Sequence, residues 1–196
     1  MRQIIGITGG IASGKSNVCS VIRSLGYNVI DCDAITHRLY EKGNSIYNAI
    51  IEVFGKEYLD NNLEIDRKKL ASYVFNNKDA LRLLNDTTHP FILNEINREI
   101  NLIKDDIIFI DIPLLYEANL EYMVDKVICV YLEEELQIER LMARDNISRE
   151  YALVKIHNQM DLKIKKDKAD YVINSNGTIE ETNALVKTTL NKIKGE

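Results

Sequence analysis

The sequence has little of what marks a secreted, membrane-spanning or multidomain protein. Its three cysteines, Cys19, Cys32 and Cys129, lie far apart and lack metal-ligand spacing. An odd number of widely spaced cysteines favours free thiols in a reducing compartment. No segment approaches the roughly 18 consecutive apolar residues of a transmembrane helix. Two prolines and nine glycines among 196 residues leave no stretch typical of a linker. We therefore expect one globular unit with insertions.

Positive charge is also in deficit. Lys and Arg total 25 against 30 Asp and Glu, a formal net charge of -5 with a sequence pI near 5.4. Such a balance provides no basic footprint, so we expect neither a nucleic-acid partner nor a membrane partner. The opening residues, MRQIIGITGG, enter an apolar strand pattern directly. This start predicts a cytoplasmic protein without a cleaved leader.

What is present is an alternation of short apolar runs and helical patterns. The runs are typical of strands buried on both faces, and they cover residues 3–8, 28–31, 106–111, 126–132 and 170–174. Between them lie amphipathic patterns such as KSNVCSVIRSLG, which ends at Gly26. In the last of these helices, Thr178 and Glu181 have the spacing of a capping box. The alternation predicts an α/β fold of three layers, with helices around a five-stranded parallel sheet.

Two intervals are too long for simple crossovers, and both predict insertions. Residues 34–104 are mostly helical in pattern and include PFILNEINREINLI, which predicts a helix beginning near Pro90. Residues 134–160 form the second insertion. We interpret the first as a helical substrate-binding insertion and the second as a helical lid. The nucleotide-binding core then consists of residues 1–33, 105–133 and 161–196.

The strongest motif is a phosphate-binding loop. Gly9, Gly14, Lys15 and Ser16 match G-x-x-x-x-G-K-[ST] between an expected strand and an expected helix. Glycines let backbone amides turn toward phosphate oxygens, and Lys15 adds a full positive charge. Ser16 offers a hydroxyl to Mg²⁺. The predicted ATP cradle comprises Gly10, Ile11, Ala12, Ser13, Gly14, Lys15 and Ser16.

A second magnesium ligand is predicted at Asp111, which ends the apolar run IIFID. A carboxylate at the end of such a strand orients the metal shell in P-loop proteins. The alternative is a turn residue at a strand end. A GTPase would need a guanine-reading Asn-Lys-x-Asp, but NNKDA places Ala80 where that aspartate belongs, which weakens a switch-protein interpretation.

The acceptor side is predicted at VIDCDAI, which ends the second strand. Ligands of parallel sheets gather at the carboxyl edge. We expect Asp33 to accept the proton of the acceptor hydroxyl, with Asp31 supporting the site and pointing the same way if the strand continues. The alternative is that Asp33 caps the next helix.

Two further positions have competing interpretations. Arg140 and Arg144 are four residues apart and share one helical face, which suits a polyphosphate clamp but also a solvated surface. His89 precedes Pro90, and a single histidine there is compatible with a structural role.

In combination, these residues resemble the dephospho-coenzyme A kinase family over nearly the whole chain. The resemblance rests on six segments in order: GITGGIASGKS, DCDAI, HPFI, DIPLLYE, RLMARDNIS and ADYVINSNG. It implies transfer of phosphate from ATP, with Mg²⁺, to the ribose 3′-hydroxyl of dephospho-CoA, on a core similar to nucleoside-monophosphate kinases.

The resemblance also implies roles for single residues. Arg140 and Arg144 would close over ATP, and Asn176 with Gly177 would line its adenine side. The acceptor would be held by Thr8, Asp33, His89, Leu114 and Leu115. This chain departs from the family pattern at Ala12, His37, Lys155 and Ser175, where glycine, arginine, arginine and asparagine are frequent.

Two rival functions are also compatible with the sequence. One is a related kinase of a nucleoside or nucleotide, and the other is a nucleotide-dependent regulatory protein. The composition of the helical insertion distinguishes a dephospho-CoA kinase from the first rival, because the insertion must then accommodate an acceptor with a long pantetheine tail. Acceptor dependence distinguishes the second, because a kinase lid suppresses hydrolysis by excluding water.

Overall fold

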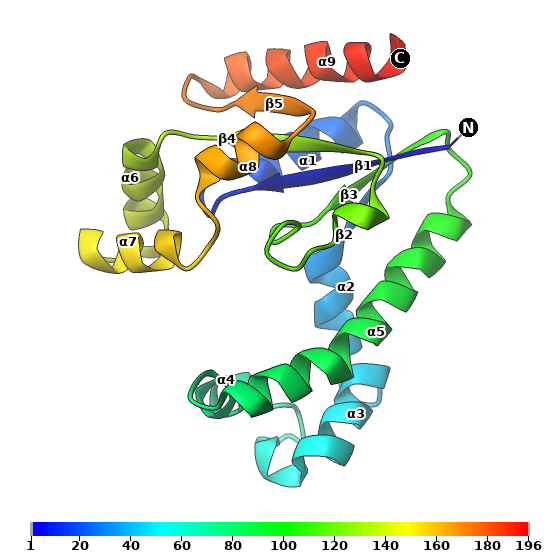
Figure 1. Cartoon of the computed structure of the whole chain (residues 1–196), viewed down its shortest axis with the longest axis vertical. Coiled ribbons are helices and arrows are strands. Elements are labelled where there is room, and N and C mark those ends of the chain that lie inside the picture. Colours follow the sequence, from blue (N-terminus) through cyan, green and yellow to red (C-terminus); the bar gives the residue numbers. More distant parts are fainter. Residues whose placement is uncertain (1, 196) are drawn as a thin grey trace. The chain divides into compact units, whose positions relative to one another are not determined.

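The computed structural model describes residues 2–195, which fold as two compact units. The core unit comprises the chain up to Ile30 and from Ile103 onward, and the helical unit comprises Asp31–Leu102. In Figure 1 the helical unit runs from light blue to green.

The core unit is built on a five-stranded parallel sheet of order β2-β3-β1-β4-β5, which confirms the predicted fold class. β1 pairs with β3 on one side, where Ile7 lies opposite Asp111, and with β4 on the other, where Thr8 lies opposite Cys129. The central place of β1 puts the loop that follows it in the middle of the carboxyl edge, where parallel sheets bind ligands. The strands are β1 (Gln3–Gly9), β2 (Val29–Asp31), β3 (Ile107–Asp111), β4 (Lys126–Tyr131) and β5 (Tyr171–Asn174).

Helices cover both faces of this sheet (Figure 1). On one face, α1 (Lys15–Ser24) and α9 (Ile179–Gly195) pack over Ile5, Ile7, Phe109 and Ile128 in a single apolar cluster. On the other face, α8 (Leu162–Lys168) places Leu162 against Cys129 and Tyr131. Successive residues of β4 thus enter opposite cores, as expected for a strand buried on both faces.

The predicted capping box of α9 is confirmed. The Thr178 amide donates to Glu181 Oε2 at 2.8 Å, and the Glu181 amide donates to Thr178 Oγ1 at 3.2 Å. Each side chain satisfies an amide that the helix itself leaves unpaired.

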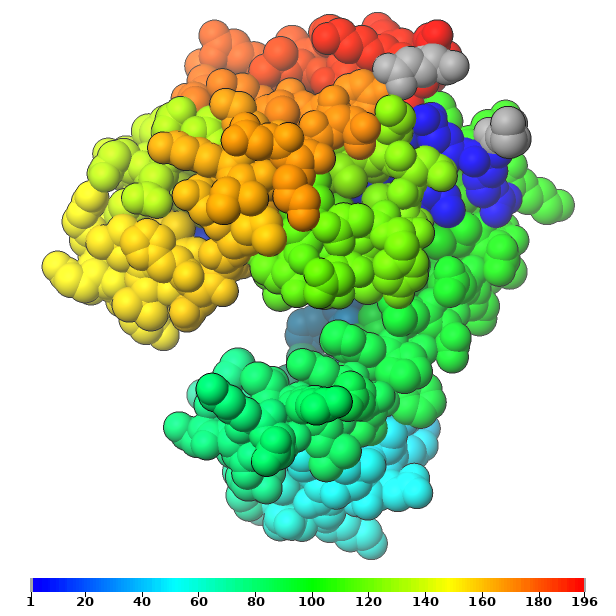
Figure 2. All heavy atoms as spheres, viewed as in Figure 1, coloured from blue at the N-terminus to red at the C-terminus, as the bar shows by residue number. Residues whose placement is uncertain are grey.

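Between β4 and α8 lie two helices, α6 (Glu134–Asp145) and α7 (Arg149–His157). Asn146 ends α6 in the left-handed region, with φ 52°, and Ser148 caps α7. Ile138 and Leu141 of α6 pack on Ala152 and Ile156 of α7. Figure 2 shows α7 and α8, in yellow and orange, on the visible surface of the core unit.

The helical unit has a small core of its own. Ile46, Ile50, Leu70 and Val74 are buried together, and Arg38 bridges α2 to α5 by contacts of 2.7 Å to Glu95 and to Glu99. Its elements are α2 (Cys32–Leu39), α3 (Ser45–Phe54), the 3-10 turn η1 (Lys56–Tyr58), α4 (Arg67–Phe75) and α5 (Lys78–Leu102).

The predicted helix start at Pro90 is wrong, because α5 runs through it from Lys78 to Leu102. Proline inside a helix removes one amide donor and crowds the preceding turn. Here the local cost is offset by burial on both sides of the proline, with Ala80 and Thr88 before it and Ile96 and Ile100 after it. Within residues 2–195, no helix has both the length and the apolar character that crossing a bilayer requires.

The buried thiol of Cys129 generates a prediction about pH. Burial raises the pKa of this thiol from 9.0 to about 12, with Lys165 and Lys166 acting weakly in the other direction. A folded-state pKa above the unfolded value means that stability is intact below pH 9 and falls as the pH rises beyond it. We expect urea unfolding at pH 8, 9 and 10 to show that the free energy of unfolding falls with pH. The contribution of this thiol should reach about 1.4 kcal/mol per pH unit.

Cys129→Ala provides the control. It should be less stable than the parent at pH 7 because it leaves a small cavity, yet its stability should fall less steeply between pH 9 and pH 10. If the stability of the two proteins fell equally with pH, the pKa of the Cys129 thiol would not be raised by folding.

Candidate active site

The phosphate-loop motif occupies the connection from β1 to α1, where the sequence predicts it. The Ser13 amide donates to the Gly10 carbonyl at 3.1 Å and closes a four-residue turn. Gly14 has φ 89°, a left-handed conformation that costs glycine little. Ala12 is also left-handed, with φ 60°, and a residue with a side chain is strained there.

The amides of this loop are poised for an anion. Within residues 2–195, no hydrogen bond engages the N–H groups of Ala12, Gly14, Lys15 or Ser16. A methyl group built on Gly14 would lie 3.8 Å from Arg140 Nη1, the nearest side-chain nitrogen around it. Unpaired amides at the start of a helix, beside two cationic side chains, form a phosphate-binding arrangement.

The charge of Lys15 is balanced by Asp111, the last residue of β3. Lys15 Nζ donates to Asp111 Oδ1, and both side chains are largely buried, at 14% and 10% exposed. Cys19 Sγ lies 3.5 Å from the other carboxylate oxygen. Burial, and next the negative charge of Asp111, raise the pKa of Cys19 to about 12. The thiol therefore remains protonated and donates its hydrogen to Asp111.

The side chains of Ser16 and Asp111 carry oxygen atoms that could bind a magnesium ion. Magnesium takes oxygen ligands and is usually held by one or two carboxylates together with substrate phosphates and water. Ser16 is exposed at the start of α1, and Asp111 supplies the carboxylate. A hydroxyl from Ser16 and a carboxylate from Asp111 therefore match the ligand chemistry of Mg²⁺.

The two leucines in the loop after β3 differ in their exposure to solvent. Leu114 is 46% exposed, whereas Leu115 is fully buried in the core. Thr8 is also fully buried, and its hydroxyl donates to the Pro113 carbonyl at 3.0 Å. In this structure Thr8 and Leu115 hold the loop in place, and of these three residues only Leu114 is exposed.

Arg140 of α6 is fixed beside the phosphate loop. Its Nη2 donates to the Ser175 carbonyl at 2.8 Å. Ser175 Oγ lies 2.7 Å from the Ser13 carbonyl, which ties the segment after β5 to the phosphate loop. Asn176 Oδ1 accepts from the Glu133 amide at 2.8 Å, so it positions the start of α6, and Gly177 follows it. These contacts bring Arg140 and the predicted adenine-side residues to one edge of the loop.

Arg144 lies one turn further along α6 and is 55% exposed. Its guanidinium contacts Asp145 at 2.8 Å, and Lys155 of α7 contacts the same carboxylate at 2.8 Å. The hydrogen bonds from Arg144 and then Lys155 hold the pKa of Asp145 at about 2. Asp145 thus keeps two cations of this segment together.

In the helical unit, Asp31 and Asp33 differ in role. β2 ends at Asp31 and α2 begins at Cys32, so strand alternation does not relate the two carboxylates. Asp31 is the residue that caps the helix, accepting from the Ala34 amide at 2.9 Å. Asp33 lies in the first helical turn and is exposed. The capping alternative therefore applies to Asp31 rather than to Asp33.

Two histidines of the helical unit are also exposed. His89 lies in the middle of α5. Arg67 Nη1 lies 2.7 Å from His37 Nδ1, and because arginine only donates, His37 Nδ1 accepts in this contact. The guanidinium of Arg67 therefore lies beside His37.

Sequence reasoning missed several buried polar residues around the loop. Gln137 of α6 and Gln159, between α7 and α8, both bind the backbone of Ile11. Lys165 of α8 is fully buried, with its ammonium 2.7 Å from Glu117 and 3.1 Å from the Pro113 carbonyl. Glutamine and lysine on helices usually face solvent, and no spacing rule separates these residues from surface ones.

The pairing of Lys15 with Asp111 generates a prediction for Asp111→Asn. Without Mg²⁺ this variant should bind inorganic tripolyphosphate at least as tightly as the parent, because it removes a negative charge that competes for Lys15. With Mg²⁺ the parent should gain affinity several-fold more than the variant, because it keeps the carboxylate ligand. Calorimetric titration with and without the metal measures both effects.

Glu139→Gln, on the exposed face of α6, provides a matched control that also removes one negative charge. It should behave as the parent in both titrations. If Mg²⁺ increased the affinity of Asp111→Asn and of the parent equally, Asp111 would not be a metal ligand.

The chain is similar to known proteins over nearly its whole length. A family model described as dephospho-CoA kinase matches residues 3–181. A dephospho-CoA kinase of Oceanobacillus iheyensis is 43% identical over 98% of both chains. Among solved structures, a dephospho-CoA kinase from Campylobacter jejuni superposes with a TM-score of 0.73 at 32% identity, over 100% of this chain and 99% of the other. A Thermus thermophilus protein superposes with a TM-score of 0.86 at 32% identity, over 97% of each chain. The chain belongs to the dephospho-CoA kinase family.

Proposed function

We propose that this chain transfers the γ-phosphate of MgATP to the ribose 3′-hydroxyl of dephospho-CoA and releases CoA and ADP. The protein is a kinase of the final step of coenzyme A synthesis, as its family membership establishes. The observation that carries the proposal is the phosphate loop, with its unpaired amides beside Lys15 and Asp111.

The first task of the site is to hold the triphosphate. The loop amides bind phosphate oxygens, and Lys15 adds a positive charge that reaches the β and γ phosphates. Ser16 and Asp111 would hold Mg²⁺, which neutralises phosphate charge when it is bound. Because Lys15 and Asp111 compensate one another in the structure, the lysine is already localised before the nucleotide arrives.

The second task is to stabilise the charge of the transferring group. Arg140 is held near Gly14 by the Ser175 carbonyl, which suits a role on the triphosphate. Arg144 is more exposed and is held by Asp145. We assign both arginines to the charge that spreads over the phosphoryl oxygens during transfer, with residues 134–160 acting as a lid.

The third task is to activate the acceptor. Asp33 takes the proton of the 3′-hydroxyl as the new O–P bond forms and the bond between the γ phosphorus and the β–γ bridging oxygen breaks. Asp31 supports it by capping the helix on which Asp33 lies. We assign binding of the acceptor to residues 34–104 with His89, and to Leu114 of the core, while Thr8 fixes the loop that presents Leu114.

Asp33→Asn tests this assignment. The amide keeps the shape of the side chain and removes the base, so turnover should fall by about 10² to 10⁴. The dissociation constants of ATP and dephospho-CoA should stay within a few-fold of the parent values. Quench-flow measurement of CoA and ADP, with calorimetry for binding, separates the two effects.

Asp86→Asn, a change on the exposed surface of α5, should leave turnover unaltered. If Asp33→Asn retained near-normal turnover, Asp33 would not be the base. If it lost binding of dephospho-CoA together with turnover, Asp33 would hold the acceptor rather than activate it.

A further inference from the structure

Two glutamines hold one residue of the phosphate loop from outside the motif. Gln137 Nε2 donates to the Ile11 carbonyl at 2.7 Å, and the Ile11 amide donates to Gln159 Oε1 at 2.9 Å. Both polar groups of one peptide residue are thus bound by side chains distant in sequence. A Cβ atom added at Gly10 would lie only 2.6 Å from Gln137 Nε2, so this close approach depends on a glycine at that position.

The hydrogen bonds act on a strained turn. Gly10, Ile11, Ala12 and Ser13 form the turn closed by the Ser13 amide, and its third residue, Ala12, has φ 60°. A positive φ at the third position is the mark of a type II turn, which favours glycine there. Rotating the Ile11–Ala12 peptide by about half a turn gives a type I turn, in which an alanine is unstrained. Left to itself, this loop should therefore favour the rotated peptide.

The orientation of that peptide determines where the Ala12 amide points. In a trans peptide the carbonyl and the following N–H point in opposite directions. Because Gln137 binds the Ile11 carbonyl, the Ala12 N–H is directed to the other side, where it has no acceptor among residues 2–195. Rotation of the peptide would turn a carbonyl oxygen toward that side instead. A phosphate on that side would be repelled by the oxygen and bound by the amide.

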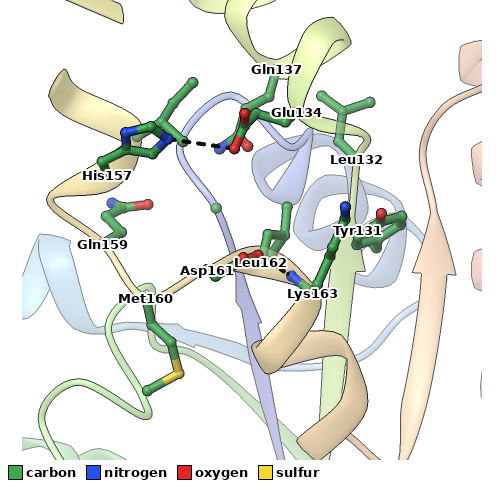
Figure 3. Close-up of a pocket in the computed structure, with 12 residues that line it drawn as sticks. Tyr131, Leu132, Glu134, Gln137, His157, Gln159, Met160, Asp161, Leu162 and Lys163 are labelled. Atoms are coloured by element: carbon green, nitrogen blue, oxygen red, sulfur yellow. Dashed lines mark hydrogen bonds and ion pairs between the residues drawn. The ribbon is translucent and has the colours of Figure 1, made fainter. Parts of the chain in front are cut away.

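The two glutamines line the same cavity. The cavity has a volume of about 260 Å³, and its lining includes Gly10, Gln137, Gln159 and Met160. Figure 3 shows Gln137 extending from α6 and Gln159 from the segment after α7, each toward the loop that follows β1. The open volume leaves room for other side-chain positions, and the hydrogen bonds to Ile11 favour the observed ones.

We propose that Gln137 and Gln159 are positioning residues that hold the Ile11–Ala12 peptide in the orientation that presents the Ala12 amide to the triphosphate. The pair compensates in this chain for an alanine at a turn position that suits glycine. Gln137 lies on α6 and Gln159 just after α7, so a shift of these helices would alter the phosphate loop directly. This inference deepens the proposed function and rests on it for the identity of the ligand.

The test is a double-mutant cycle between Gln137→Met and Ala12→Gly. Methionine keeps the length of glutamine but donates no hydrogen bond. Gln137→Met should weaken binding of inorganic tripolyphosphate by roughly tenfold, since a peptide carbonyl loses its donor. In the Ala12→Gly background the same change should cost at most about threefold, because glycine tolerates a positive φ without support. Binding of adenosine should be unchanged throughout.

Gln159→Met gives an independent variant at a less buried position, and it should also weaken tripolyphosphate selectively. Glu139→Gln is the matched control on α6 and should bind as the parent does. Circular dichroism at the titration temperature establishes that each variant is folded. In turnover assays the KM for ATP should rise in Gln137→Met more than kcat falls.

Three results would overturn the inference. These are an unchanged tripolyphosphate affinity in both glutamine variants, equal losses for tripolyphosphate and adenosine, and an effect of Gln137→Met that is as large in the Ala12→Gly background as in the parent. A parent protein that failed to bind tripolyphosphate at all would instead refute the proposed function. The two failures are therefore distinguishable.

Discussion

The contact between Lys15 and Asp111 is the interaction on which the site depends. It forms because β1 and β3 are neighbours in the sheet. Lys15, which begins α1 after β1, therefore lies next to Asp111, which ends β3. Removal of either partner would leave a largely buried charge without compensation, which costs far more than an exposed ion pair contributes. The sheet order therefore determines where positive charge is available for a phosphate. Cys19, one turn into α1, fixes the second oxygen of the same carboxylate.

The other side of the loop is held by α6 and the segment that follows α7. Gln137 and Arg140 are three residues apart and so lie on one face of α6. One contacts the Ile11 carbonyl and the other the Ser175 carbonyl, close to Gly14. A single helix thus supports the backbone of the phosphate loop and supplies a guanidinium to its edge. We therefore expect the proposed nucleotide binding and the position of this helix to be coupled, because α6 contacts the loop at two points.

Much of this arrangement follows from local sequence, and the rest depends on tertiary contacts. The five strands, the phosphate loop and the cap of α9 are predictable because short-range patterns determine them, and Asp111 is found because it ends an apolar run. The helix through Pro90 was not predictable, since burial on both sides of the proline outweighs its local preference. Asp31 rather than Asp33 caps α2 because the strand ends at Asp31 and the helix begins at the next residue. The roles of Gln137, Gln159 and Lys165 depend on partners distant in sequence, and no local pattern marks them.

The most direct test of the account is product analysis with defined acceptors. The purified protein is incubated with MgATP and dephospho-CoA, and in parallel with adenosine, AMP or no acceptor, while CoA and ADP are followed by mass and the phosphorylated position by phosphorus NMR. We expect CoA and ADP in equal amounts, phosphate on the ribose 3′-oxygen, and little ADP without an acceptor. ADP formed without CoA, or phosphate transferred preferentially to adenosine or AMP, would contradict it.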